Sequence, residues 1–307
     1  MKVAVLTGGV GGAKLVLGLI HAMPAVDVTA IVNTGDDFVH LGLSISPDID
    51  TLLYTLSGKA NTAQGWGREG EGWAFMAAIR SLGGEDWFAL GDGDLALHIV
   101  RTARLRAGDT LSAITADHAK RWGIEARLLP MTDDRVATML DTDEGELSFQ
   151  HYFVARRCEP KVRRIRFEGD SGARPAPGVI EALHAADAVL IAPSNPFLSV
   201  DPLLAVPGIR EALAEVAAPV VAISPLVGGK AVKGPTAKLM AELGIGIEAT
   251  AIARHYKGAI DAILVDERDE PGSLDLPSAR ADTLMISLED RIRVARAALD
   301  LAASLPR

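Results

Sequence analysis

Four aspartates lie close together near the N-terminus and could hold a divalent cation. Asp36, Asp37, Asp48 and Asp50 fall within fifteen positions, after an apolar run typical of a buried parallel strand. Carboxylate oxygens are the ligands that Mg²⁺ prefers, and a cation held by them can lie beside a diphosphate. Helix capping and ordinary solvation are the alternative explanations of the same residues.

Whether Asp48 and Asp50 can bind the same ligand depends on the local backbone structure. Side chains two positions apart share a side in an extended segment and diverge on a helix. Pro47, which precedes them, favours a loop that enters a helix, with one of the two aspartates as the N-cap. We therefore expect both carboxylates at the start of a helix that spans about 48–56.

A glycine-rich segment could bind a phosphate. Thr7-Gly8-Gly9-Val10-Gly11-Gly12 separates a strand candidate from a helix candidate, and Lys14 follows. Glycines let the backbone approach a phosphate, the first N–H groups of a helix are unpaired donors, and Lys14 could add a charge. Lys14 stands where the dinucleotide fingerprint has its third glycine, and the P-loop order is absent. A plain turn is the alternative.

Two later loops carry groups suited to a nucleotide. Ser194 and Asn195 stand between two prolines, directly after an apolar strand candidate, where a hydroxyl, an amide and backbone donors could face a ligand. The segment 225–235 combines glycines with two lysines, namely Gly228, Gly229, Lys230, Lys233 and Gly234. Such a loop could close on a phosphorylated substrate, and a surface loop is the alternative.

Two more acidic segments are candidates. Asp92 and Asp94 flank Gly93, and we expect Asp94 to cap a helix that carries His98 one turn inside. Asp133 and Asp134 follow another strand candidate and could bind ribose hydroxyls, metal or phosphate, with a surface turn held by an ion pair as the alternative. The histidines show no metal-ligand spacing, and no G-x-S-x-G elbow marks a nucleophilic serine.

The elements that must position these groups alternate between strand and helix. Parallel strands are predicted at 2–6, 28–32, 125–129, 188–192, 220–224, 262–265 and 283–286, and antiparallel strands at 146–154 and 161–167. Helices are predicted at 13–23, 48–56, 73–82, 95–106, 111–122, 179–185, 208–216, 237–243 and 288–303.

This pattern predicts an α/β fold in a single domain. We expect a Rossmann-like parallel sheet core flanked by helices over about 1–60 and 175–307, and a smaller helical and antiparallel excursion over about 61–174. Open parallel sheets bind ligands beyond the carboxyl ends of their strands, which is where the candidate loops fall.

Composition narrows the class of protein further. The 307 residues are 49% hydrophobic and 23% charged, which predicts a packed core. The net charge of -9 disfavours a nucleic-acid partner. Cys158 is the only cysteine, so an internal disulfide and a cysteine-rich zinc site are excluded. The apolar N-terminal run is too short for a signal sequence or a membrane span, and we expect a cytoplasmic protein without a membrane partner.

Taken together, the motifs resemble the 2-phospho-L-lactate transferase family of coenzyme F-420 biosynthesis over nearly the whole chain. The resemblance rests on seven segments in this order, namely Thr7 to Lys14, Asn33 to Asp37, Ser46 to Tyr54, Leu90-Gly91-Asp92, Met131 to Arg135, Ala192 to Pro196 and Ser224-Pro225.

The resemblance implies a homodimer that uses Mg²⁺, a GMP-linked donor such as lactyl-2-diphospho-5′-guanosine, and the deazaflavin acceptor Fo. It implies that Asp50 contacts the ribityl chain of Fo, and that Asp36 and Asp48 orient metal or hydroxyl. By matching position, Asp48 and Asp50 are the catalytic candidates and Asp36, Asp48 and Asp50 the metal candidates. The groups expected to hold the guanosine diphosphate portion and the remaining substrate are Gly8, Gly9, Gly11, Gly12, Lys14, Asn33, Asp92, Asp133, Asp134, Ser194, Asn195, Gly229 and Lys230.

One departure leaves the transferred acid open among lactate, enolpyruvate and glycerate. The family often reads Gly-Asp-Arg-Asp where this chain has Gly93 in the third position, so Lys230 or Arg101 could replace the missing cation. A noncatalytic nucleotide-sugar sensor of the gluconeogenesis-factor type is the alternative, since it shares the glycine opening and the Ser-Asn-Pro turn. An NAD-dependent dehydrogenase is disfavoured by Lys14.

Overall fold

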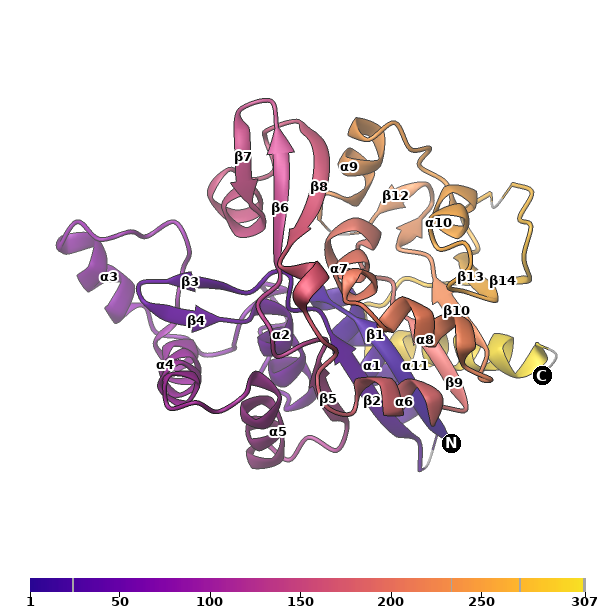
Figure 1. Cartoon of the computed structure of the whole chain (residues 1–307), viewed down its shortest axis with the longest axis horizontal. Coiled ribbons are helices and arrows are strands. Elements are labelled where there is room, and N and C mark those ends of the chain that lie inside the picture. The colour runs from indigo at the N-terminus through magenta and orange to yellow at the C-terminus, as the bar shows by residue number, and fades with distance from the viewer. Residues whose placement is uncertain (24, 233, 271, 306–307) are drawn as a thin grey trace.

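A seven-stranded parallel sheet forms the centre of the computed structural model, which describes residues 1–23, 25–232, 234–270 and 272–305 (Figure 1). Its strands are β1 (Lys2–Thr7), β2 (Asp27–Val32), β5 (Arg127–Pro130), β9 (Ala188–Ile191), β10 (Val220–Ile223), β13 (Ala262–Asp266) and β14 (Ser278–Ala281). They lie in the order β14-β13-β10-β9-β1-β2-β5, so the chain reverses its direction of growth between β1 and β9. The predicted α/β class is confirmed, and the reversal is where open sheets bind ligands.

Helices cover both faces of the sheet. Val3 and Val5 of β1 pack with α1 (Gly9–Ala22), α2 (Pro47–Leu56) and α11 (Leu288–Ser304), while Ala4 and Leu6 pack with α6 (Val179–His184) and α8 (Ile209–Glu215). Figure 1 shows α6 and α8 in front of the sheet and α1 and α11 behind it. Because both faces are buried, the strands read as continuous apolar runs, which is why the sequence predicts them.

A lobe built from the segment between β2 and β5 stands away from the sheet (Figure 1, left). It contains the hairpin β3 (Phe38–His40) and β4 (Leu43–Ile45), followed after α2 by α3 (Ala74–Ser81), α4 (Asp92–Arg106) and α5 (Leu111–Arg121). The chain then returns to the central sheet as β5, beside β2. The predicted limits of the excursion were therefore wrong in placing this core strand inside it.

A three-stranded antiparallel sheet follows β5 and consists of β6 (Ala137–Thr142), β7 (Gly145–Ser148) and β8 (Val162–Glu168), in the order β7-β6-β8. The strand β6 was not predicted, because two threonines, Thr138 and Thr142, occupy its buried side and obscure the alternation. The predicted strand 146–154 is too long, since the chain turns after β7 into the short π-helix η1 (His151–Ala155).

The C-terminal half adds smaller elements around the carboxyl ends of the strands. They are η2 (Asp170–Gly172), the π-helix η3 (Pro196–Val200), α7 (Asp201–Ala205), the hairpin β11 (Leu226–Val227) and β12 (Lys230–Ala231), α9 (Thr236–Glu242) and α10 (Ala249–His255). The helix α10 was not predicted. None of the helices in the described part of the chain has the length and apolar run needed to cross a bilayer.

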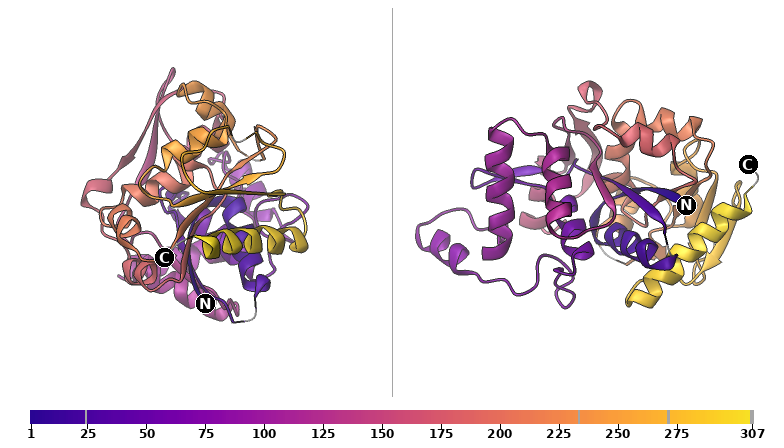
Figure 2. Two further views of the ribbon diagram at one scale, coloured as in Figure 1. Left: turned by 90° about the vertical axis from the view of Figure 1, so that its right-hand side faces the viewer. Right: turned by 90° about the horizontal axis from the view of Figure 1, so that it is seen from below.

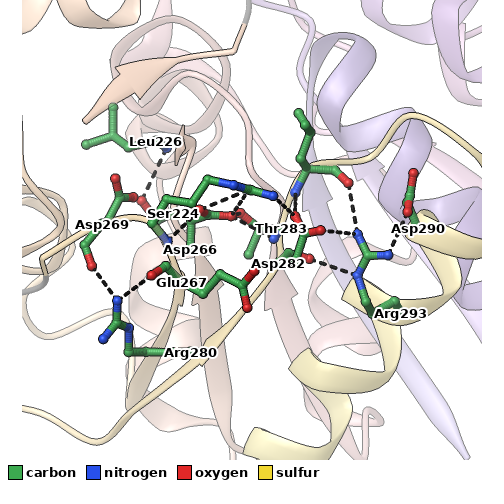
Figure 3. A network of polar contacts seen from close by, with 12 residues as sticks. Ser224, Leu226, Asp266, Glu267, Asp269, Arg280, Asp282, Thr283, Asp290 and Arg293 are labelled. Atoms are coloured by element: carbon green, nitrogen blue, oxygen red, sulfur yellow. Dashed lines mark hydrogen bonds and ion pairs between the residues drawn. The ribbon is translucent and has the colours of Figure 1, made fainter. Parts of the chain in front are cut away.

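A polar network holds the outer edge of the sheet (Figure 3). The buried carboxylate of Asp266, at the end of β13, accepts hydrogen bonds from the backbone N–H and the hydroxyl of Thr283 at 2.8 and 3.0 Å. Arg293 of α11 binds both Asp282 and Asp290. Thr283 is bound to Asp266 and does not pair with a strand, so the predicted strand 283–286 is wrong. The last strand is β14, which ends at Ala281.

Two glycines differ in the space that surrounds them. A Cβ on Gly18 of α1 would overlap the backbone carbonyl of Arg291 in α11, so the two helices touch there (Figure 2, right). Gly172 has open space where its Cβ would be, and its φ is not positive.

We predict that Gly18→Ala destabilises the protein by about 1 kcal/mol or more. Because the added Cβ would lie well under 3.0 Å from a backbone oxygen, the clash falls at the upper end of the usual cost of about 1–3 kcal/mol and exceeds the helix propensity of about 1 kcal/mol that alanine gains. Thermal unfolding of both variants checks this, with Gly172→Ala expected within about 0.5 kcal/mol of the native chain. Equal stability of the two variants would contradict the close contact between α1 and α11.

Candidate active site

The glycine turn and Ser194 meet at the reversal between β1 and β9. The backbone N–H of Gly8 donates to Ser194 Oγ at 3.3 Å, and the Ser194 hydroxyl donates to the carbonyl of Gly8 at 2.7 Å. Asn195 caps η3, since its side-chain oxygen accepts from the backbone of Phe197 and Leu198. The structure thus brings together two segments that lie 186 positions apart in the chain.

Much of the predicted glycine loop is helical, and its glycines let the helix approach neighbouring backbone closely. The helix α1 begins at Gly9 and not at the predicted residue 13, so Gly11 and Gly12 lie in its first turn. A Cβ on Gly12 would overlap Thr7 Oγ1, and one on Gly11 would lie 2.7 Å from the carbonyl oxygen of Pro193. The N-terminus of α1 is therefore pressed against the ends of β1 and β9, where it can meet an anion.

The carboxylate of Asp48 joins three segments. Its Oδ1 accepts the backbone N–H of Gly9 at 2.7 Å, and its Oδ2 accepts the Asn33 amide at 3.0 Å. Asn33 also donates to the carbonyl of Leu198 and accepts from the backbone N–H of Gly35. Asp48 is buried, so this single side chain fixes α2 against α1 and against the turn after β2.

Asp50 points elsewhere, because both aspartates lie in the first turn of α2. Its two oxygens bind the guanidinium of Arg101, a residue of α4 that is 1% exposed. The helix begins after Ser46, whose hydroxyl donates to Asp37 at 2.7 Å, so neither Asp48 nor Asp50 is the N-cap. The prediction that Asp36, Asp48 and Asp50 form one metal group is therefore wrong as regards Asp50.

A buried polar chain leads outward from Asp50. His98 lies between two carboxylates, with Nδ1 3.7 Å from Asp50 and Nε2 3.1 Å from Asp94. The Tyr54 hydroxyl donates to Asp94 at 2.5 Å. Although burial opposes it, these hydrogen bonds and the nearby His98 lower the pKa of Asp94. Asp94 lies inside α4 and Gly91 precedes the helix, so the predicted N-cap is wrong.

Of the remaining carboxylates, Asp36 and Asp48 are buried and Asp37 is half-buried, and no cation is paired with them in the described part of the chain. Burial, and next the charge of Asp48, raise the pKa of Asp36 well above its ordinary value. Burial raises the pKa of Asp37 well above its ordinary value and that of Asp48 to about 6, against the hydrogen bonds from Asn33 and Gly9. Arg101 is engaged by Asp50, so Asp36 and Asp48 are the carboxylates that a bound cation would stabilise.

Several buried polar atoms at this edge have no hydrogen-bond partner among the residues that the structure describes. They are Thr7 Oγ1, Thr34 Oγ1, Asp36 Oδ1, Asp37 Oδ1 and Asn195 Nδ2. Buried polar groups are rarely left without a hydrogen bond, so a concentration of them indicates a ligand site.

The same observations test the fit of Mg²⁺. Asp36 Oδ1 is buried and unpartnered, and Asp48 lies close enough to raise the pKa of Asp36. Within the described ranges, no group of three or more His, Cys, Asp or Glu residues is arranged to hold a metal ion. Two carboxylates still fit Mg²⁺, which proteins usually bind through one or two carboxylates together with substrate phosphates and water.

Two of the predicted ligands, Asp92 and Asp133, hold helix ends in this structure, and a third, Asp134, holds a loop. Asp92 accepts the backbone N–H groups of Ala74 and Phe75 at the start of α3. Asp133 binds the backbone N–H and hydroxyl of Ser112 at the start of α5, both at 2.7 Å. Asp134 is exposed and accepts the backbone N–H of Arg174. These contacts give each carboxylate a partner within the protein, and of the alternatives that the sequence offered the surface turn is seen at Asp134.

The predicted lysines and the later glycine loop lie at the margin of the site. Lys14 donates to the carbonyl of Met285 at 2.6 Å. Gly229 and Lys230 belong to the hairpin of β11 and β12, where Asp269 accepts the backbone N–H of Gly229 and Lys230 is exposed. Lys233 lies outside the described residues.

Arg68 supplies the cation beside Gly93. A Cβ on Gly93 would overlap the Arg68 guanidinium, and Glu71 accepts both the backbone N–H of Gly93 at 2.6 Å and Arg68 at 3.3 Å. Arg101 is bound to Asp50, and Lys230 belongs to β12, which Figure 1 shows above β10 and away from α3 and α4, so neither of the two predicted replacements is there. The sequence gives no signal for Arg68, which meets Gly93 only through the fold.

Comparison with known proteins finds a family model that matches nearly the whole chain. Residues 3–295 match the family described as 2-phospho-L-lactate transferase CofD. Proteins named phosphoenolpyruvate transferase from Streptomyces griseus and Streptomyces coelicolor are each 44% identical to the chain, with 98% of both sequences covered. One of that name from Nocardia farcinica is 38% identical over 98% of the chain and 95% of its own length.

Solved structures share the fold at lower identity. A member of the UPF0052 family from Bacillus halodurans superposes with a TM-score of 0.63 at 20% identity, covering 97% of this chain and 99% of that one.

We predict that Arg101→Met destabilises the protein by about 3–5 kcal/mol, because it leaves Asp50 buried and unpaired. The double variant Asp50→Asn with Arg101→Met should recover part of that loss. Urea unfolding measures both. Arg121→Met is the control, since Arg121 is an exposed partner of Asp117 and should cost less than about 1 kcal/mol. A similarly small loss for Arg101→Met would show that the buried pair of Asp50 and Arg101 does not hold α4 against α2.

Proposed function

The chain belongs to the 2-phospho-L-lactate transferase CofD family and is a transferase, and from this membership we propose that it acts in coenzyme F-420 biosynthesis. The proposed reaction moves a phosphoenolpyruvyl group from a GMP-linked diphosphate donor to the deazaflavin Fo and releases GMP. Membership of a transferase family sets aside the noncatalytic sensor and the dehydrogenase as alternatives.

The choice of acid follows from the relatives. Proteins 38–44% identical over nearly the full length bear the name phosphoenolpyruvate transferase. This similarity favours enolpyruvate over the lactyl and glyceryl groups that the sequence alone leaves open.

One observation carries the proposed chemistry: two buried carboxylates, Asp36 and Asp48, lie beside the N-terminus of α1 at the reversal of the sheet. The diphosphate of the donor would face the backbone N–H groups of Val10 and Gly11, which are part-exposed in the first turn of α1. Ser194 and Asn195 line the other side of that turn and would contact the donor from β9.

Asp36 and Asp48 would hold Mg²⁺, which when bound neutralises negative charge on the diphosphate. Asp48 can do so while it keeps its contacts with Gly9 and Asn33, because each carboxylate oxygen has two acceptor positions. The cation would in turn stabilise the ionised form of both carboxylates.

The transfer itself forms one bond and breaks one. The terminal ribityl hydroxyl of Fo attacks the phosphorus that carries the enolpyruvyl group, and a new P–O bond forms. The P–O bond to the phosphate of GMP breaks, and its electron pair leaves with GMP. The proton of the hydroxyl would pass to Asp36, whose Oδ1 is buried and has no hydrogen-bond partner among the described residues, so that it is free to accept it. Such reactions need positioning and charge neutralisation more than covalent help.

Asp50 acts in this account through Arg101 and not on the reacting atoms. Its oxygens are engaged by the guanidinium, and the pair fixes α4 against α2. Asp50 is therefore a positioning residue, and Asp36 takes the role of base.

We predict that the purified chain, given Fo, guanylylated phosphoenolpyruvate and Mg²⁺, releases one GMP for each enolpyruvyl deazaflavin formed. Mass spectrometry of the deazaflavin measures the product. Asp36→Asn should lower kcat by about 100-fold, as expected for loss of a general base. The control Asp134→Asn should stay within about twofold, because Asp134 holds a surface turn. If no product forms with enolpyruvyl, lactyl or glyceryl donors, the proposed function is wrong.

We predict that the stabilisation given by Mg²⁺ depends on pH through Asp48. Its pKa is raised to about 6 from 3.8, so its contribution to stability is fully present below pH 3.8 and is lost as pH rises through about 6. Mg²⁺ offsets that loss where the carboxylate is ionised. The rise in Tm on adding Mg²⁺ should thus be larger at about pH 7.5 than at about pH 5. Asp48→Asn should reduce this difference, and an equal rise at both pH values would rule out the assignment.

A further inference from the structure

The outer face of α4 is apolar although it is open to solvent. Ile99 and Val100, in the middle of the helix, are 49% and 47% exposed, and Ala96 and Ala103 on either side of them are also exposed. These four positions follow one another at the spacing of a single helix face, so they form a stripe along the helix. Figure 2 (right) shows α4 along its length, beside α5. Exposed apolar side chains that gather in this way mark an interaction surface.

The opposite face of α4 is already used within the chain. His98 and Arg101 are buried there, and the guanidinium of Arg101 binds Asp50 of α2. These contacts hold the helix by its inner side, and they involve neither Ile99 nor Val100. The fold of a single copy therefore does not explain why the middle of the outer face is apolar.

The charges at the two ends of α4 make the helix complementary to itself. Asp92 in the first turn and Arg106 in the last turn are both exposed. Two copies of the helix packed antiparallel would set Asp92 of each copy beside the partner's Arg106, and the two helix dipoles would oppose each other. Arg106 donates to the carbonyl of Gly42 at 3.0 Å and has further N–H donors for a second contact. A partner of uniform charge would instead meet one end of like charge, so the charges favour a second copy of the chain.

The order of the residues has the symmetry that a two-fold contact requires. In an antiparallel pair centred between Ile99 and Val100, Ile99 of one copy faces the partner's Val100, and Ala96 faces the partner's Ala103. The alanines are small, so the two helices can approach closely on both sides of the central pair. The centre of the stripe is also the centre of α4, so the charged ends meet in the same arrangement.

Segments at both ends of α4 can complete such a contact. A specific interface buries about 800 Å² on each partner, which is more than one helix face offers. At one end of α4, Asp92 accepts the backbone N–H of the exposed Ala74 in α3 at 3.2 Å. At the other end, Arg106 is bound to Gly42, in the turn between β3 and β4. Both segments therefore adjoin the stripe and can contribute to an interface that has α4 at its centre.

We propose that α4 packs antiparallel against α4 of a second copy of this chain, about a two-fold axis that passes between Ile99 and Val100. The sequence resemblance implies a homodimer but places no contact, and the outer face of α4 supplies one. Each α4 would then bind its own Asp50 through the inner face and the partner's α4 through the outer face. The dimer contact would thus hold the helix that positions Asp50.

Sedimentation velocity over a range of protein concentrations tests the assignment, and the native chain should form a dimer. Val100→Glu sets two carboxylates side by side at the axis and should raise the Kd of the dimer by at least about 100-fold. Circular dichroism should show this variant folded, because Val100 is half exposed. Ile286→Glu is the matched control, since Ile286 is 71% exposed just before α11, and it should leave the Kd within about twofold.

A disulfide between two copies tests the position of the axis. In a chain that also carries Cys158→Ser, Val100→Cys should give a covalent dimer on mild oxidation, because residues beside a two-fold axis come within the Cα separation of about 4–7 Å that a disulfide needs. Ile286→Cys in the same background should give no covalent dimer.

Two results would overturn the proposal. A native chain that stays monomeric would leave the outer face of α4 to a different protein. A native dimer that Val100→Glu leaves intact, without a disulfide in the Val100→Cys variant, would place the contact elsewhere. Neither measurement uses a substrate, so the proposed reaction stands or fails separately.

Discussion

Several carboxylates are buried side by side in this protein, and the rest of the site depends on which groups compensate their negative charge. Asp50 is met by Arg101 from α4. Asp48 is met by the Gly9 N–H and the Asn33 amide, which are neutral donors. Asp36 keeps a buried oxygen without a hydrogen-bond partner in the described part of the chain. An ionised carboxylate in such surroundings is costly, so the fold leaves a place where a cation and a phosphate stabilise the protein together.

The architecture around this place serves to bring distant segments to one edge. The reversal of the sheet sets the end of β1 beside the end of β9, and glycines in α1 let the helix approach both. The hairpin β3–β4 then returns the chain so that α2 aims Asp48 at the N-terminus of α1.

Much of the fold could be predicted from the sequence, because parallel strands with both faces buried are continuous apolar runs between helical patterns. The meeting of Gly8 with Ser194, and of Asn33 with Asp48, follows from the rule that loops gather at the carboxyl ends of such strands. The partner of Asp50 could not be predicted, since Arg101 lies 51 positions away on a helix whose placement no local pattern fixes. Asp92 and Asp133 show the same limit, because an aspartate that caps another helix has the same local sequence as one that binds a ligand. The strand β6 could not be predicted either, because two of the three residues on its buried side are threonines and hide the alternation of apolar and polar positions.

The most direct measurement of the central claim is a crystal structure of the chain with GDP, Fo and Mn²⁺ in place of Mg²⁺, with the metal located by its anomalous scattering. We predict one metal bound by Asp36 and Asp48, with the β-phosphate of GDP over the first turn of α1. Asp50 should still be paired with Arg101. A metal bound by Asp50, or a diphosphate away from the β1–α1 junction, would contradict it.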